Sequence, residues 1–141
     1  MTEIIRVSDF LRRTLFADAA TCLGCGLLLA AGGAFLEDLT GLPVGLMFYA
    51  GTSLFPFAAF LLYAATRKSL SKTVLWLIVG LNLLWTIDSF LLLAAGYVAP
   101  TALGSAFVVF QALGVAGFAA LELLGLRRAE VVAMSDAREV I

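Results

Sequence analysis

Residues 73–96 read TVLWLIVGLNLLWTIDSFLLLAAG, a run in which Asp88 is the only charged residue. At about 1.5 Å per residue, a helix of this length extends about 36 Å, more than the roughly 30 Å hydrocarbon core of a bilayer. Three further runs of similar length and character cover residues 14–36, 42–65 and 101–126. The sequence therefore predicts four membrane-spanning helices.

The overall composition agrees with this prediction. Hydrophobic residues make up 62% of the chain and charged residues 13%, whereas about a quarter of the residues in a soluble domain are charged. The sequence contains no histidine and has a net charge of −1. These features argue against a histidine-ligated metal or haem cofactor and against a nucleic-acid partner. We expect a protein of the lipid bilayer with no cofactor.

The loops between the four runs are short and carry the Gly, Pro, Ser and charged residues that mark turns. Short loops make sequential helices antiparallel neighbours. We therefore expect an all-α, integral membrane four-helix up-down-up-down bundle in a single domain over residues 1–141, with a cytoplasmic tail at 127–141. Apolar residues repeat at helical spacing over residues 4–15, which indicates either an amphipathic interfacial helix or an extension of the first span.

The basic residues predict the orientation. All nine fall at one end of the expected bundle: Arg6, Arg12, Arg13, Arg67, Lys68, Lys72, Arg127, Arg128 and Arg138. Loops on the cytoplasmic side of membrane proteins are enriched in Lys and Arg. Both termini are therefore expected in the cytoplasm.

Polar and small residues share one arc of each expected helix, which indicates that they face the bundle interior. Asp88 lies among them with no basic residue at its depth, so we expect it to keep its proton. It either belongs to a ligand-binding or proton-coupling site or, as a neutral acid, hydrogen-bonds Gln111 and fixes the register of the third and fourth helices. The full set of candidates is Asp88, Gln111, Asn82, Thr52, Tyr49 and Trp85.

Asp18 and Glu122 lie at similar depth, near the end of the expected bundle that carries the basic residues. We expect them to form ion pairs at the inner interface with Arg127 and Arg128, whose long side chains reach toward the headgroups. The alternative is that the two carboxylates form a cation entry site.

Cys22 and Cys25 have the spacing of a thioredoxin-like motif. A membrane thiol oxidase needs a second cysteine pair to relay electrons, and the chain has two cysteines in total. An apolar setting also suppresses the reactive thiolate. We therefore do not expect a redox role.

Residues 82–89 (NLLWTIDS), 100–104 (PTALG) and 125–128 (GLRR), together with Phe107, Gln111 and Ala112, resemble small four-span bacterial inner-membrane proteins. The resemblance covers the second half of the chain. It implies the same architecture and a place in the bacterial inner membrane. That family has no assigned activity, so the resemblance implies no catalytic residue.

The functional expectation is a non-enzymatic binding or accessory protein of the membrane. Its polar cluster around Asp88 and Gln111 would hold a lipid-like or other small amphipathic ligand. The alternative is a small proton-coupled transporter that uses Asp88. Because four helices enclose little space, we also expect association into a homo-oligomer or a larger membrane complex.

Overall fold

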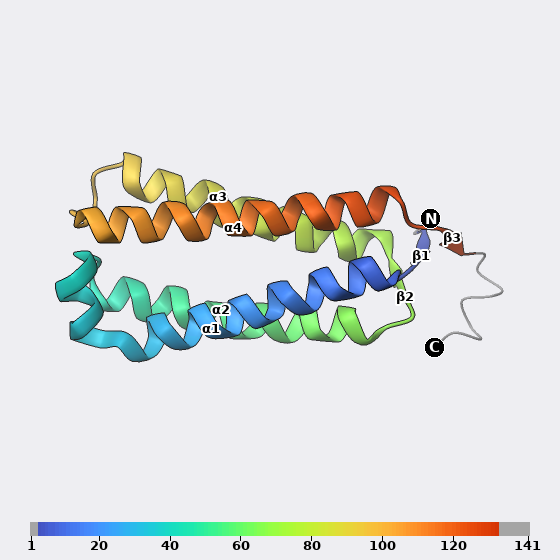
Figure 1. Cartoon of the computed structure of the whole chain (residues 1–141), viewed down its shortest axis with the longest axis horizontal. Coiled ribbons are helices and arrows are strands. Elements are labelled where there is room, and N and C mark those ends of the chain that lie inside the picture. Colours follow the sequence, from blue (N-terminus) through green and yellow to red (C-terminus); the bar gives the residue numbers. More distant parts are fainter. Residues whose placement is uncertain (1–2, 133–141) are drawn as a thin grey trace.

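The computed structural model describes residues 3–132, and within this range the chain forms a bundle of four long helices (Figure 1). The helices are α1 (Asp9–Thr40), α2 (Val44–Thr66), α3 (Lys72–Ala94) and α4 (Ala102–Arg127). Each is long and apolar enough to cross a membrane. The predicted all-α four-helix fold is confirmed, and the chain is a multi-pass membrane protein.

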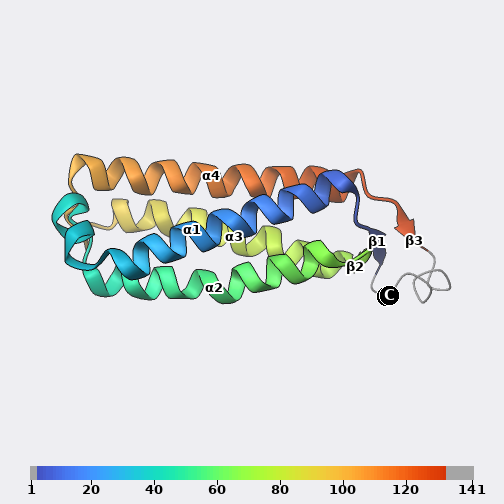
Figure 2. The same cartoon turned by 60° about the horizontal axis from the view of Figure 1, so that its bottom comes forward.

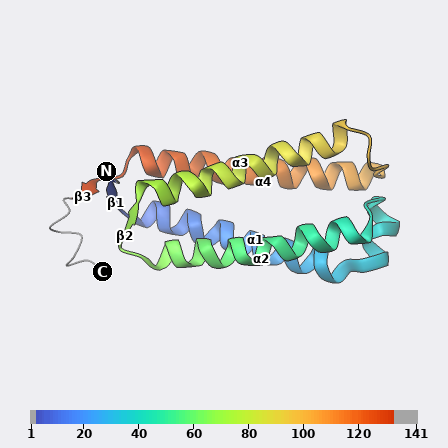
Figure 3. The same cartoon turned by 180° about the vertical axis from the view of Figure 1, so that it is seen from behind.

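The bundle consists of two helical hairpins. Helix α1 packs along α2 and α3 packs along α4, as the views from opposite sides show (Figures 1 and 3). Gly26 and Gly51 lie at a close contact of α1 with α2: a Cβ atom at Gly51 would lie 2.8 Å from the backbone oxygen of Gly26. Contact between the hairpins includes α1 against α4 (Figure 2). Small residues permit this close backbone packing in lipid.

A small antiparallel sheet closes the end that carries the basic residues, which we call the basic end. Its strands are β1 (Ile4–Arg6), β2 (Ser69–Ser71) and β3 (Val131–Val132), in the order β2-β1-β3. The sheet joins the segment before α1, the loop between the hairpins and the segment after α4. It therefore ties both hairpins together at this end.

The sheet corrects the expectation of an interfacial helix over residues 4–15. The chain is extended at Ile4–Arg6, and α1 begins at Asp9 as an extension of the first span. Ser8 caps this helix, because its hydroxyl oxygen accepts a hydrogen bond from the amide of Leu11 at 3.2 Å. Strand β3 also lies in the expected tail, and residues 133–141 of that tail lie outside the described residues.

An ion pair lies beside the sheet at the surface. The Nζ atom of Lys72 lies 2.9 Å from Oε2 of Glu3, and both side chains are exposed. The hydrogen bond from Lys72 lowers the pKa of Glu3 below its usual value. Exposed pairs of this kind stabilise a fold little.

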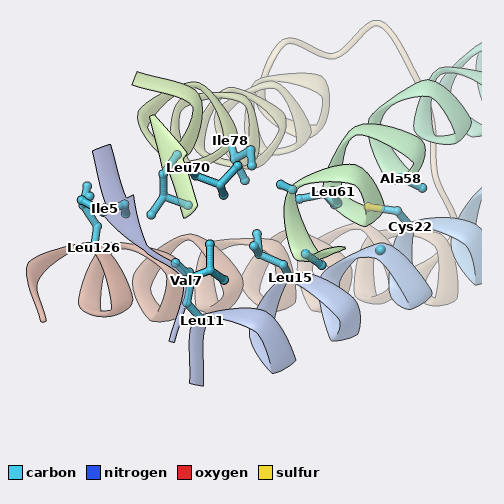
Figure 4. Close-up of a cluster of buried hydrophobic side chains, with 14 of the residues drawn as sticks. Ile5, Val7, Leu11, Leu15, Cys22, Ala58, Leu61, Leu70, Ile78 and Leu126 are labelled. Carbon is cyan, nitrogen blue, oxygen red and sulfur yellow. The ribbon is translucent and has the colours of Figure 1, made fainter. Parts of the chain in front are cut away.

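The main hydrophobic cluster fills the space between the sheet and the middle of the bundle (Figure 4). Ile5 from β1 and Leu70 from β2 pack there with residues of all four helices. The fully buried members with the largest side chains are Ile5, Leu11, Leu15, Leu61, Leu75 and Ile78. This cluster packs the two hairpins against each other near the basic end.

At the end of the bundle opposite the sheet, hydrogen bonds between the end of α1 and the start of α4 join the two hairpins. Helix α1 breaks at Gly33, whose φ of 50° and ψ of −139° are a conformation that few other residues adopt. The short arm after the break brings Thr40 to the start of α4. The carbonyl oxygen of Thr40 accepts from the amide of Thr101 at 2.8 Å, and the Thr101 hydroxyl donates to Leu39 at 2.6 Å. Both ends of the bundle are thus tied.

Candidate functional site

Between the tied ends, three hollows lie between the two hairpins. We call them together the interhairpin cleft, and Trp85 lines all three. Their volumes are about 210, 270 and 250 Å³. The largest is lined chiefly by apolar side chains, among them Leu29, Met47, Leu92 and Phe107.

A hydrogen-bonded network crosses from α3 to α4 on one wall of the cleft. The indole nitrogen of Trp85 donates to Oε1 of Gln111 at 2.7 Å. Nε2 of Gln111 donates to the hydroxyl of Ser89 at 2.9 Å and to the carbonyl oxygen of Val108 at 3.0 Å. Both ends of the Gln111 amide are therefore occupied within the chain.

Asp88 does not take part in this network. Asp88 and Gln111 form no hydrogen bond within residues 3–132, so the alternative in which this pair fixes the helix register is wrong. Trp85 and Ser89 are four residues apart and share the face of α3 that meets Gln111, whereas Asp88 is rotated by about 100° from Ser89. Its exposed side chain lines two of the hollows, and no hydrogen bond to it is found within residues 3–132.

Tyr49 and Thr52 lie apart from the network. The Tyr49 side chain is 74% exposed, and the Thr52 hydroxyl donates to the carbonyl oxygen of Phe48 in its own helix at 2.8 Å. Neither residue lines the three hollows. Within residues 3–132, these two candidates form no hydrogen bond to Asp88 or Gln111.

Asn82 belongs to a second polar cluster, which we call the acid cluster and define as Asp18, Asn82 and Glu122. Nδ2 of Asn82 donates to Oδ2 of Asp18 at 2.8 Å and to Oε2 of Glu122 at 3.1 Å. The three side chains come from α1, α3 and α4, and they are 0%, 2% and 0% exposed. One amide thus joins both hairpins.

Two neighbouring groups complete the surroundings of the acid cluster. The Cys22 thiol lies 3.6 Å from Oδ1 of Asp18 and donates to it. The Thr86 hydroxyl donates to the backbone oxygen of Asn82 at 3.0 Å. Oε1 of Glu122 is buried and has no hydrogen-bond partner among residues 3–132. Cys22 and Cys25 are both free thiols.

The predicted ion pairs of Asp18 and Glu122 with Arg127 and Arg128 are wrong. Both arginines are exposed, and no ion pair links either of them to these two carboxyl groups. The apolar runs begin inside the bundle, so they place the two carboxyl groups too close to its end. The cluster around Leu11 lies between these groups and the sheet at the basic end.

The acid cluster was not predicted as a unit. Its signal was present, since Asp18, Asn82 and Glu122 each lie on the interior arc of their helix. Sequence alone did not supply the vertical offset of one helix against the next, which decides which polar groups meet. The offset in the structure places the Asn82 amide, with its two donor hydrogens, between the carboxyl groups of Asp18 and Glu122.

The fold and these clusters define a multi-pass membrane protein with a polar interior and a cleft between two hairpins. No known protein family, no curated protein and no solved structure matches the chain.

Proposed function

We propose that the chain is a non-enzymatic binding protein of the membrane that holds a lipid-like or other small amphipathic molecule in the interhairpin cleft. The observation that carries the proposal is the position of Asp88, whose exposed side chain lines two mainly apolar hollows. A carboxyl group at this depth is costly without a partner, and such residues commonly mark a functional site.

The lining suits a molecule with an apolar body and one polar group. Leu29, Met47, Leu92 and Phe107 offer apolar contact in the largest hollow, and Asp88 is its free polar group. Ligand sites in proteins commonly combine an apolar lining with a few polar groups that fix orientation. Because Gln111 is already bonded on both sides of its amide, Asp88 is the group we assign to the ligand.

The test compares two substitutions on the same helix. Ala50 lines the largest hollow, whereas Ala59 is exposed and lines none of the three. Native mass spectrometry of protein released with its own membrane lipids should show a retained small molecule on the wild type and on Ala59→Phe. Ala50→Phe, which fills the hollow, should lose it.

A second measurement reports the position of the molecule. In a Trp76→Phe background, Trp85 is the remaining tryptophan and lines every hollow. In vesicles of phosphatidylcholine brominated on its acyl chains, Trp85 fluorescence should be quenched, and Ala50→Phe should reduce the quenching. Equal behaviour of Ala50→Phe and Ala59→Phe in both measurements would contradict the proposal.

The second candidate function is a small proton-coupled transporter that uses Asp88. The same unpaired carboxyl group supports it, since a group without a partner is free to exchange a proton for a cationic ligand. In proteoliposomes with a pH gradient and ethidium as the test cation, Asp88→Asn should then abolish coupled movement. A binding protein should show no such movement in the wild type.

We also propose a place in the bacterial inner membrane with the basic end in the cytoplasm. The enrichment of Lys and Arg at that end supports this orientation. Association with further copies or with a larger membrane complex remains part of the same proposal, because the space inside one bundle is small.

A further inference from the structure

The acid cluster places two carboxyl groups close together inside the bundle. Oδ2 of Asp18 and Oε2 of Glu122 lie 2.8 and 3.1 Å from the same nitrogen of Asn82, so they are no farther apart than the sum of these distances. Two carboxylates this close repel each other unless one of them carries a proton.

The acid cluster has one hydrogen-bond donor fewer than it has carboxyl oxygens. Asn82 provides two donor hydrogens and Cys22 provides one, while the two carboxyl groups have four oxygens. The oxygen left over is Oε1 of Glu122, which is buried without a partner. A proton on this carboxyl group would turn the unpartnered oxygen into a donor.

No basic group neutralises the pair within residues 3–132. Arg12 of α1 donates to the carbonyl oxygens of Ala65 and Arg67, and the ion pair found in this range joins Lys72 to Glu3. The neighbours from α3 are neutral, since Asn82 is an amide and the Thr86 hydroxyl donates to backbone oxygens.

Two negative charges in this position would be strongly unfavourable. Removing a single carboxylate from water costs several kcal/mol even after relaxation. Paired aspartates at close range in proteases share one proton because they cannot both ionise. We propose that Asp18 and Glu122 form a proton-binding site that holds one proton between them, with Asn82 bonded to both carboxyl groups.

A groove on the α1–α4 face runs beside this site, although neither acid lines it. It has a volume of about 460 Å³ and is lined by Asp9, Arg13, Ala17 and Leu121 among others. Ala17 and Leu121 directly precede the two acids in the sequence. This proposal does not rest on the proposed ligand, because its argument uses neither Asp88 nor the largest hollow.

The test is infrared spectroscopy of the protein in phosphatidylcholine nanodiscs at neutral pH. The starting protein is Asp88→Asn, which removes the other acid expected within the membrane. It should show a protonated carboxylic C=O band that shifts in ²H₂O. Adding Asp18→Asn and Glu122→Gln together should abolish the band, because both replacements are neutral and of similar shape.

A labelling experiment covers the case in which the combined variant does not fold. Selective ¹³C labelling of either Asp or Glu side-chain carboxyls in the otherwise unchanged Asp88→Asn protein should shift the band. A missing band, a band that survives the Asp18→Asn/Glu122→Gln change, or a band insensitive to both labels would each overturn the proposal. None of these results bears on retention of a ligand in the cleft, so the two proposals fail separately.

Discussion

Replacing Asn82 with leucine tests whether the acid cluster holds the two hairpins together. Leucine is close to asparagine in size, so the substitution removes the amide without opening a large cavity. It breaks the bonds to Asp18 and Glu122, which measure 2.8 and 3.1 Å. We expect a clear loss of stability, because both bonds link different helices.

The expected size follows from the number of groups affected. Side-chain hydrogen bonds between membrane helices contribute about 0.6 kcal/mol on average and at most about 1.7 kcal/mol. A buried acceptor that is left without a partner costs about 1–3 kcal/mol. With two acceptors exposed to an apolar neighbour, Asn82→Leu should lower the free energy of unfolding by about 2–4 kcal/mol.

The assay is unfolding by sodium dodecyl sulfate in mixed micelles, followed by tryptophan fluorescence and far-ultraviolet circular dichroism. Thr52→Val is the matched control, because the Thr52 hydroxyl bonds only within its own helix. That control should change stability by no more than about 0.5 kcal/mol. If Asn82→Leu is as stable as the control, the acid cluster does not hold the hairpins and the reasoning fails.

Two further substitutions test the packing at other levels of the bundle. Gly51→Ala should destabilise the protein by about 1–3 kcal/mol, since the new Cβ would lie 2.8 Å from the backbone oxygen of Gly26. Gly80→Ala is the control and should not destabilise the protein, because its new Cβ meets nothing within 4 Å among the described residues. Equal losses of stability in the two variants would refute the close packing of α1 on α2. Ile5→Ala should lower the free energy of unfolding by about 2–5 kcal/mol, because the Ile5 side chain is 1% exposed. Val131→Ala should lower it little in the same unfolding assay, because Val131 is 62% exposed. A small loss for Ile5→Ala would show that β1 does not support the core.

The sequence predicted the helices because their signal is long and one-dimensional. A run of more than about 20 apolar residues has few structural solutions in a chain with so little charge. Short loops then made neighbouring helices antiparallel. The same reasoning did not reveal the sheet, since strands as short as Val131–Val132 carry no alternating pattern. Their pairing joins segments that are far apart in the chain.

The polar groups were harder to place, because their partners depend on two quantities that composition does not encode. One is the rotation of each helix, which directs Trp85 toward Gln111 and turns Asp88 into the cleft. The other is the offset along the bundle axis, which brings Asp18 to Asn82 instead of to an arginine. An error of one residue rotates a side chain by about 100°. The polar arc of each helix therefore indicated which residues face the other helices, but not which of these side chains contact each other.

The cleft and the acid cluster share a wall, which links the two proposals physically. One hollow is lined by Asp18 and Cys22 as well as by Trp85 and Gln111. The sheet and the bonds of Thr101 join the hairpins at the two ends of the bundle, and the acid cluster joins them between these ends. A relative movement of the hairpins at this level would change the volume of the cleft and the contacts of the acid cluster together. In Asn82→Leu, a change in Trp85 fluorescence before unfolding would report this coupling, whereas an unchanged spectrum would show that the two clusters behave independently.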